Sequence, residues 1–183
     1  AIITNEFIRN LSITQFVVFD TNLSLLNILK KIKLNKPLNT IAITGTNGKT
    51  SVVWYISQIL NYNNILVKSY GTLGYYINLK KKYSSKLTTP DFTILHQTAY
   101  SSKKNLYNYV FEASSHALSQ NRIKDLKVDT AALTNISQDH LDYHKDFKTY
   151  KKAKLKLFFN HLNESGWAVL NDKIADIEII KNK

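Results

Sequence analysis

The sequence lacks cysteine and methionine altogether and has only a few prolines, glycines and arginines. Without cysteine the chain can form neither disulfides nor thiolate metal sites, which is compatible with the cytoplasmic protein that we expect. The chain begins with Ala1 where a natural full-length protein begins with methionine, so we expect a piece of a longer protein or a processed product. No apolar run approaches the roughly 20 residues of a membrane span, and no signal-peptide pattern opens the chain, so we expect no membrane partner.

Acidic residues are also scarce, and the resulting net charge of +12 suggests a nucleic-acid partner at first sight. Only Arg9 and Arg122 among the 25 basic residues are arginines, whereas surfaces that read bases rely on bidentate arginine. The lysines are spread over many segments instead of forming one stripe. We therefore expect no nucleic-acid partner.

Short apolar segments alternate with amphipathic ones along the chain. Strands are predicted at 16–19, 41–43, 65–67, 109–111, 128–133 and 167–170, and helices at about 48–61, 91–102, 147–161 and 174–180. This alternation predicts an α/β fold, with a mostly parallel sheet covered by helices on both faces. A linker around Pro37 divides the chain into residues 1–36 and 37–183, and the second part holds the sheet.

The most informative stretch is Thr40 to Ser51, TIAITGTNGKTS, which predicts a strand, a glycine turn and a helix that opens at Lys49. Backbone N–H groups of such a loop bind phosphate, the lysine reaches the outer phosphates, and the hydroxyl that follows it ligates Mg²⁺. The generic spacing would place glycine at position 43, where this chain has isoleucine, and a simple glycine turn is the alternative. The flanking strand and helix favour a P-loop for a nucleotide, formed by Gly45, Thr46, Asn47, Gly48, Lys49, Thr50 and Ser51.

Polar residues follow two further predicted strands. Because the carboxyl ends of parallel strands meet at one edge of a sheet, we expect these residues to join the glycine loop there. Glu112 is placed to complete a magnesium site, although an ordinary acid at a strand end is the alternative. Ser114 to His116 lack the G-x-S-x-G elbow of a hydrolase. Arg122 suits phosphate recognition or a surface position, and Asp139 to His144 suit a metal site or a solvated loop.

Lys154 falls in the middle of the apolar stripe of the helix predicted at 147–161, which is formed by Phe147, Tyr150, Leu157 and Phe158. A lysine that faces a core is costly unless it is neutralised or paired. A neutral amine can add CO₂ and become a carbamate, which is an anionic oxygen ligand for Mg²⁺. The alternative is a lysine at the edge of the stripe that extends to solvent.

Taken together, these segments resemble the Mur ligases, the ATP-dependent amino acid ligases of peptidoglycan precursor synthesis. The resemblance covers about residues 40–172 and lies in five segments in the family's order: TGTNGKTS, LTTPD, EASSHALSQNR, NISQDHLDYH and YKKAK. Within the family the sequence is most similar to the tripeptide-forming members. Residues 1–36 resemble the end of the family's N-terminal UDP-binding domain, and 37–183 an incomplete central ATP-binding domain.

The resemblance implies that ATP binds residues 45–51, with Thr50 on a first Mg²⁺ ion. Glu112 and His140 would hold a second Mg²⁺, and Lys154 matches the lysine that is carbamylated in this family. The implied catalytic residues are Lys49, Glu112, His140 and Lys154. Contacts with the UDP-muramoyl-dipeptide are implied for Thr88, Thr89, Ser114, Gln120 and Arg122, whereas Leu87 stands where relatives often have asparagine.

The implied reaction joins UDP-N-acetylmuramoyl-L-alanyl-D-glutamate to an amino acid, diaminopimelate or lysine, through an acyl phosphate. We also expect a monomer. The resemblance implies that the chain lacks the family's adenine and amino acid sites and is therefore inactive alone. Two alternatives remain: a folylpolyglutamate or cyanophycin type ligase, which shares the GTNGKT loop, and a nucleotide-binding module without catalysis. The segments LTTPD and SSHALSQNR argue against the first alternative.

Overall fold

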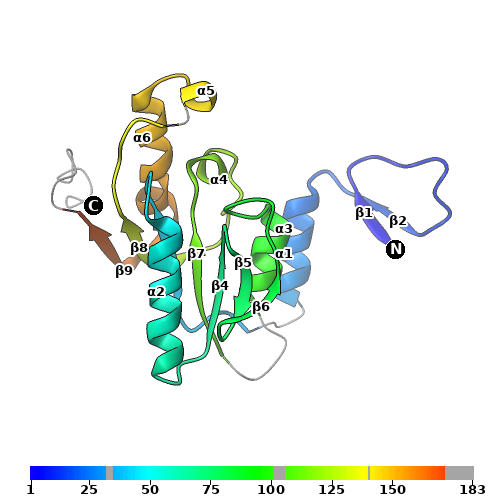
Figure 1. Cartoon of the computed structure of the whole chain (residues 1–183). Helices are drawn as coiled ribbons and strands as arrows, with labels where there is room; N and C mark the ends of the chain where they lie inside the picture. Colours follow the sequence, from blue (N-terminus) through cyan, green and yellow to red (C-terminus); the bar gives the residue numbers. More distant parts are fainter. Residues whose placement is uncertain (32–34, 101–105, 140, 172–183) are drawn as a thin grey trace.

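The computed structural model describes residues 1–31, 35–100, 106–139 and 141–171 (Figure 1). The helix predicted at 174–180 lies outside these residues. The elements follow in the order β1 (Ile2–Thr4), β2 (Gln15–Val17), α1 (Thr21–Lys31), β3 (Thr40–Thr44), α2 (Lys49–Tyr62), β4 (Val67–Gly71), β5 (Gly74–Ile77), β6 (Lys80–Tyr83), α3 (Phe92–Ala99), β7 (Asn108–Glu112), α4 (Ser115–Ser119), β8 (Val128–Leu133), α5 (Leu141–His144), α6 (Phe147–Lys156), the π-helix η1 (Leu157–His161) and β9 (Leu162–Leu170).

Among the described residues, the strands from β3 to β9 form a seven-stranded sheet in the order β6-β5-β4-β7-β3-β8-β9. The strands from β4 to β9 in this order are parallel, and β5 and β6 are antiparallel to their neighbours at one edge. β3 lies between β7 and β8, so that Ile43 pairs with Glu112 on one side and with Ala132 on the other. The predicted α/β fold with a mostly parallel sheet is confirmed.

Helices cover both faces of this sheet (Figure 1). On one face α2 places Val53 against Ile43 and Val110. On the other face α3, α4 and η1 form the larger core, in which Leu95, Leu118 and Phe158 belong to the same buried cluster as Tyr109 and Phe111. Because β3 and β7 are buried on both faces, their sequences read as almost continuous apolar runs.

The N-terminal strands β1 and β2 pair in parallel with each other and project away from the main sheet (Figure 1). The carboxylate of Asp20 caps α1 by accepting hydrogen bonds from the amides of Asn22 and Leu23, at 2.9 and 3.0 Å. α1 packs beside α3, and its Leu26 is buried. The division of the chain at residues 36 and 37 stays a prediction. No helix in the described ranges is long and apolar enough to cross a membrane.

Several boundaries differ from those expected. Lys80 to Lys82 lie in the exposed edge strand β6, which was not among the predicted strands, and lysines on an edge strand keep its unpaired backbone solvated. The helix predicted at 147–161 changes to π-helix at Leu157. β9 begins at Leu162, which pairs with Val128 of β8, and its pairing resumes at Trp167 after a register shift. Phe147 is 41% exposed although it belongs to the predicted stripe.

Candidate functional site

The glycine loop joins the central strand β3 to α2. Gly45 and Gly48 have φ values of +146° and +82°, which side chains other than glycine adopt with strain. A Cβ atom at Gly45 would also collide with the hydroxyl of Thr134. The N-terminal N–H groups of α2, which have no acceptor within the helix, face this turn, so the geometry is that of a phosphate loop.

The segment after β8 holds the loop in shape. The amides of Thr46 and Asn47 donate to the main-chain and side-chain oxygens of Asn135, at 3.0 and 2.9 Å. Thr134 Oγ1 donates to the Asn47 carbonyl at 2.6 Å, and the Thr46 hydroxyl lies 2.9 Å from that of Tyr150 in α6. Sequence reasoning missed Thr134 and the role of Asn135. Their position directly after a strand beside β3 was the available signal.

Two lysine amines converge on one carbonyl oxygen of the loop. Lys49 Nζ donates to the carbonyls of Gly45 at 2.8 Å and Thr46 at 2.7 Å, and Lys154 Nζ donates to the same Gly45 oxygen at 2.6 Å. Lys154 is only 1% exposed, so the structure buries it in the core side of α6 and excludes a lysine that extends to solvent.

This convergence shifts the proton affinity of both amines. Burial lowers the pKa of Lys49, although the charges of Glu112 and Asp139 oppose the shift. Burial, assisted by repulsion from Lys49, lowers the pKa of Lys154 to about 7. A large fraction of the Lys154 amine is therefore neutral near pH 7, which is the form that reacts with CO₂.

Glu112 ends β7 beside the loop and is 1% exposed. Its Oε1 accepts hydrogen bonds from the Thr50 hydroxyl at 2.9 Å and from the Thr72 amide at 2.7 Å. A Cβ atom at Gly71 would collide with this carboxyl group, so a glycine at the end of β4 makes room for it. Thr50 and Glu112, which were predicted as ligands of two different Mg²⁺ ions, are thus hydrogen-bonded to each other in the structure.

These oxygens fit the ligand preference of Mg²⁺. The described residues contain no group of three or more His, Cys, Asp or Glu side chains that could hold a metal ion. A magnesium ion at a phosphate loop also takes oxygens from a hydroxyl and from the bound phosphates, so the Thr50 and Glu112 pair fits such an ion. His140, predicted as a ligand, lies outside the described residues.

The residues predicted to contact the UDP-muramoyl-dipeptide belong to one hydrogen-bond network. The Thr89 hydroxyl donates to the Glu112 carbonyl at 2.6 Å and accepts from the Ser114 amide at 2.8 Å. Arg122 donates from Nη1 to the Thr89 carbonyl at 3.0 Å and from Nε to Gln120 Oε1 at 2.8 Å. This network connects β7 to the turn after α4.

A cavity of about 280 Å³ joins these residues to the loop. Its lining supplies cationic groups from Lys49 and Arg122 together with the amine of Lys154, and no carboxylate occurs among the described residues that line it. Sequence reasoning missed Ser115 as a lining residue, and its buried Oγ lacks a hydrogen-bond partner in the described structure. The other lining residues are Leu87, Thr88, Thr89, Ser114 and His116, whereas Gln120 is not one of them.

A phosphate loop after the central parallel strand, with a buried acid at the end of the neighbouring strand, defines the class of α/β nucleotide-binding domains. Similarity to known proteins identifies the family within this class. A family model described as the Mur ligase middle domain matches residues 43–183, and the chain therefore belongs to the Mur ligase family.

The UDP-N-acetylmuramoyl-L-alanyl-D-glutamate–2,6-diaminopimelate ligase of Rickettsia bellii is 46% identical over 151 residues, which are 80% of this chain and 32% of that protein. The chain thus spans about a third of the length of the curated relatives it matches.

Solved structures agree with this assignment. A structure of a UDP-N-acetylmuramoyl-L-alanyl-D-glutamate–2,6-diaminopimelate ligase superposes with a TM-score of 0.71 and 29% identity, and the match covers 100% of this chain and 37% of that one. A bifunctional folylpolyglutamate synthase/dihydrofolate synthase superposes with a TM-score of 0.63, covering 88% of this chain and 44% of that one. Its identity of 17% shows a shared fold alone.

Proposed function

We propose that the chain belongs to an ATP-dependent ligase that adds diaminopimelate or lysine to UDP-N-acetylmuramoyl-L-alanyl-D-glutamate in peptidoglycan precursor synthesis. The observation that carries the proposal is the cavity that places Lys49 of the phosphate loop in one lining with Thr89, Ser114 and Arg122. A cationic cavity without carboxylates in its described lining suits two anionic substrates. The similarity to 2,6-diaminopimelate ligases that act on UDP-N-acetylmuramoyl-L-alanyl-D-glutamate supports this choice of acceptor.

The reaction requires an attack by one anion on another. A carboxylate oxygen of the acceptor attacks the γ-phosphorus of ATP, the bond to ADP breaks, and an acyl phosphate forms. The amine of the incoming amino acid then attacks the acyl carbon, releasing phosphate and a proton. Lys49 and the N–H groups of the loop offset the charge on the transferred phosphoryl group, and Arg122 holds the acceptor. Bound Mg²⁺ at Thr50 and Glu112 would neutralise further charge.

Lys154 is the residue through which this site would gain a further oxygen ligand. Addition of CO₂ to its neutral amine releases a proton and leaves a carbamate, whereas an ammonium cannot bind a metal ion. The buried position of Lys154 beside the loop supports this proposal. In carbon-13 bicarbonate with Mg²⁺ and an ATP analogue, we expect a carbamate resonance that the Lys154→Met variant lacks. A wild-type spectrum without that resonance would remove the carbamate from the mechanism.

The acceptor is tested by calorimetry of the 183-residue chain with Mg²⁺ and a non-hydrolysable ATP analogue. We expect UDP-N-acetylmuramoyl-L-alanyl-D-glutamate to bind, and Arg122→Ala to weaken it at least about tenfold, because a hydrogen bond to a charged group contributes roughly 1.5–3 kcal/mol. Arg9→Ala, at an exposed position outside the cavity, is the matched control. Binding of a dihydrofolate acceptor instead would indicate a ligase of the folylpolyglutamate type. Binding of the ATP analogue alone would favour a module without catalysis.

A further inference from the structure

The N–H donors of Arg122 are shared between two partners, Gln120 and Thr89. Of its five N–H groups, the one on Nε and one on Nη2 point to Gln120 Oε1, and one on Nη1 points to the Thr89 carbonyl. One N–H group on each terminal nitrogen remains beyond these bonds, and such a pair matches the two oxygens of a carboxylate. The value of Arg122 as an anion anchor therefore depends on how firmly Gln120 holds the other side of its guanidinium group.

Gln120 is held in turn by a residue from a different part of the chain. A guanidinium group can only donate, so Gln120 has to present its amide oxygen to Arg122 and its NH₂ group in the opposite direction. That NH₂ group donates to the hydroxyl oxygen of Tyr143, in α5, at 3.1 Å. The bonds form a directed series from Tyr143 through Gln120 to Arg122.

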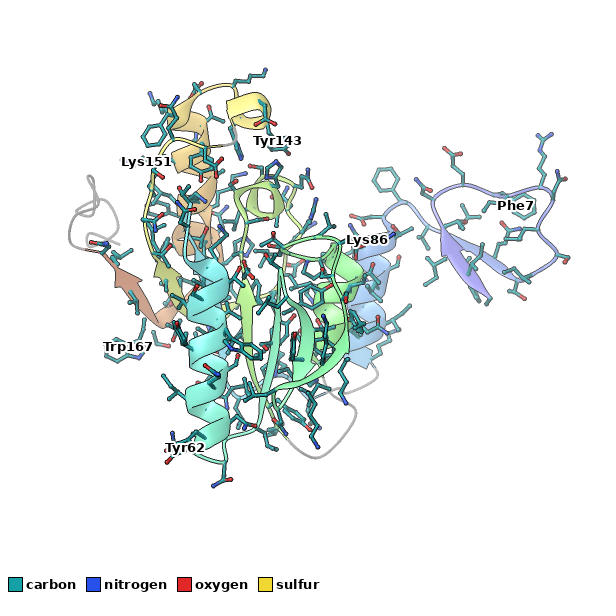
Figure 2. All side chains as sticks on the ribbon, viewed as in Figure 1. Phe7, Tyr62, Lys86, Tyr143, Lys151 and Trp167 are labelled. Carbon is teal, nitrogen blue, oxygen red and sulfur yellow. The ribbon has the colours of Figure 1, made fainter. Side chains whose placement is uncertain are left out.

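The ring of Tyr143, which is 40% exposed, makes contacts of its own that do not involve its hydroxyl group. It packs on the imidazole of His116, in α4, with ring centroids 4.1 Å apart, and edge-on to His144 at 4.8 Å. Figure 2 shows Tyr143 on α5 above α4. The segment that carries it follows directly after Asn135, which holds the phosphate loop. Tyr143 thus connects the anion anchor to the same segment that shapes the loop.

We propose that Tyr143 is a positioning residue for the acceptor substrate, which acts through Gln120 to orient Arg122 toward the cavity. This inference rests on the proposed function, because the anion that Arg122 receives is the acceptor of that reaction. Tyr143 touches neither substrate in this role. Its hydroxyl oxygen fixes the amide of Gln120, and the amide fixes the guanidinium group.

The chain offers an unusually direct readout, because Arg9 and Arg122 are its only arginines. Labelling with nitrogen-15 arginine gives two Nε–H signals, which the Arg9→Lys variant assigns. Tyr143→Phe keeps the ring against His116 and removes only the acceptor for Gln120. We expect the Arg122 Nε–H proton to exchange with water roughly three- to tenfold faster in this variant, as for the loss of one hydrogen bond, while Arg9 is unchanged.

The same signal measures substrate binding. Titration with UDP-N-acetylmuramoyl-L-alanyl-D-glutamate should shift the Arg122 signal, with a dissociation constant roughly three- to tenfold higher in Tyr143→Phe and an unchanged affinity for the ATP analogue. Tyr62→Phe is the matched control, at 88% exposure and at the far end of α2 (Figure 2). Adding Gln120→Glu to Tyr143→Phe should restore slow exchange, because a carboxylate pairs with Arg122 without help from Tyr143.

Each outcome either supports or overturns the positioning role of Tyr143. Unchanged exchange at Arg122 in Tyr143→Phe overturns the inference whatever the substrate is, and faster exchange with an unchanged affinity for the dipeptide overturns the positioning role. If the wild-type Arg122 signal ignores the dipeptide, the proposed function fails, and the exchange rates alone then decide whether Tyr143 holds Arg122.

Discussion

At the scale of single residues, the buried amine of Lys154 makes the stability of the fold depend on pH. Its pKa falls from the ordinary value of 10.5 to about 7 in the folded chain. Between these two values the unfolded chain holds a proton that the folded chain has lost, so this residue adds stability as the pH rises through that range. Below pH 7 the buried ammonium carries its full desolvation cost.

We therefore expect Lys154→Met to be more stable than the wild type at pH 6 to 7, because methionine fills the same space without a charge. In CO₂-free buffer, this advantage should shrink by roughly 1 kcal/mol per pH unit between pH 7 and 9. Urea unfolding at several pH values measures it. Lys152→Met, at an exposed position of the same helix, should show the pH dependence of the wild type. An advantage of Lys154→Met that stays constant with pH would contradict the lowered pKa.

At the scale of elements, the ends of β4 and β7 are matched to each other through Gly71 and Glu112. Gly71→Ala should force the Glu112 carboxyl group away from Thr50 and destabilise the fold by about 1–3 kcal/mol, the usual cost of overpacking. In a Glu112→Ala background the same substitution has room, so the two changes should be strongly non-additive. Additive free energies of unfolding, measured by urea denaturation of the four proteins of this cycle, would show that the contact is not the cause.

The sequence predicted those elements whose burial leaves a direct pattern. β3, β7 and the last part of β8 read as apolar runs because they lie in the interior of the sheet, and the rule for strand ends then predicted which clusters meet. β9 was predicted only from Trp167 onward, because Asn163 to Ser165 are polar, and β6 was not predicted, because its three lysines leave no apolar pattern. Contacts such as Asn47 with Asn135 join positions 88 residues apart, and no local pattern encodes such a pairing.

At the scale of the whole molecule, the loop, Glu112 and the cavity use residues from Gly45 to Lys154 on one edge of one sheet. A ligand that binds only this folded arrangement stabilises the entire unit by mass action. We expect Mg²⁺ with an ATP analogue, at about one hundred times the dissociation constant, to raise the free energy of unfolding by about 2.7 kcal/mol. Chelation of Mg²⁺ should remove most of that gain.

The Thr50→Val variant distinguishes the contribution of Mg²⁺ from that of the phosphate loop to this gain in stability. Valine keeps the shape of threonine but lacks the hydroxyl that reaches Glu112, whereas Lys49 and the loop are retained. The variant should keep the gain from the analogue alone and lose the further gain from Mg²⁺. Tyr55→Phe, at a 61% exposed position of α2 outside the loop, should behave like the wild type. Equal stabilisation of wild type and Thr50→Val by Mg²⁺ would place the ion elsewhere and leave Glu112 as a structural acid that holds Thr50 and Thr72 together.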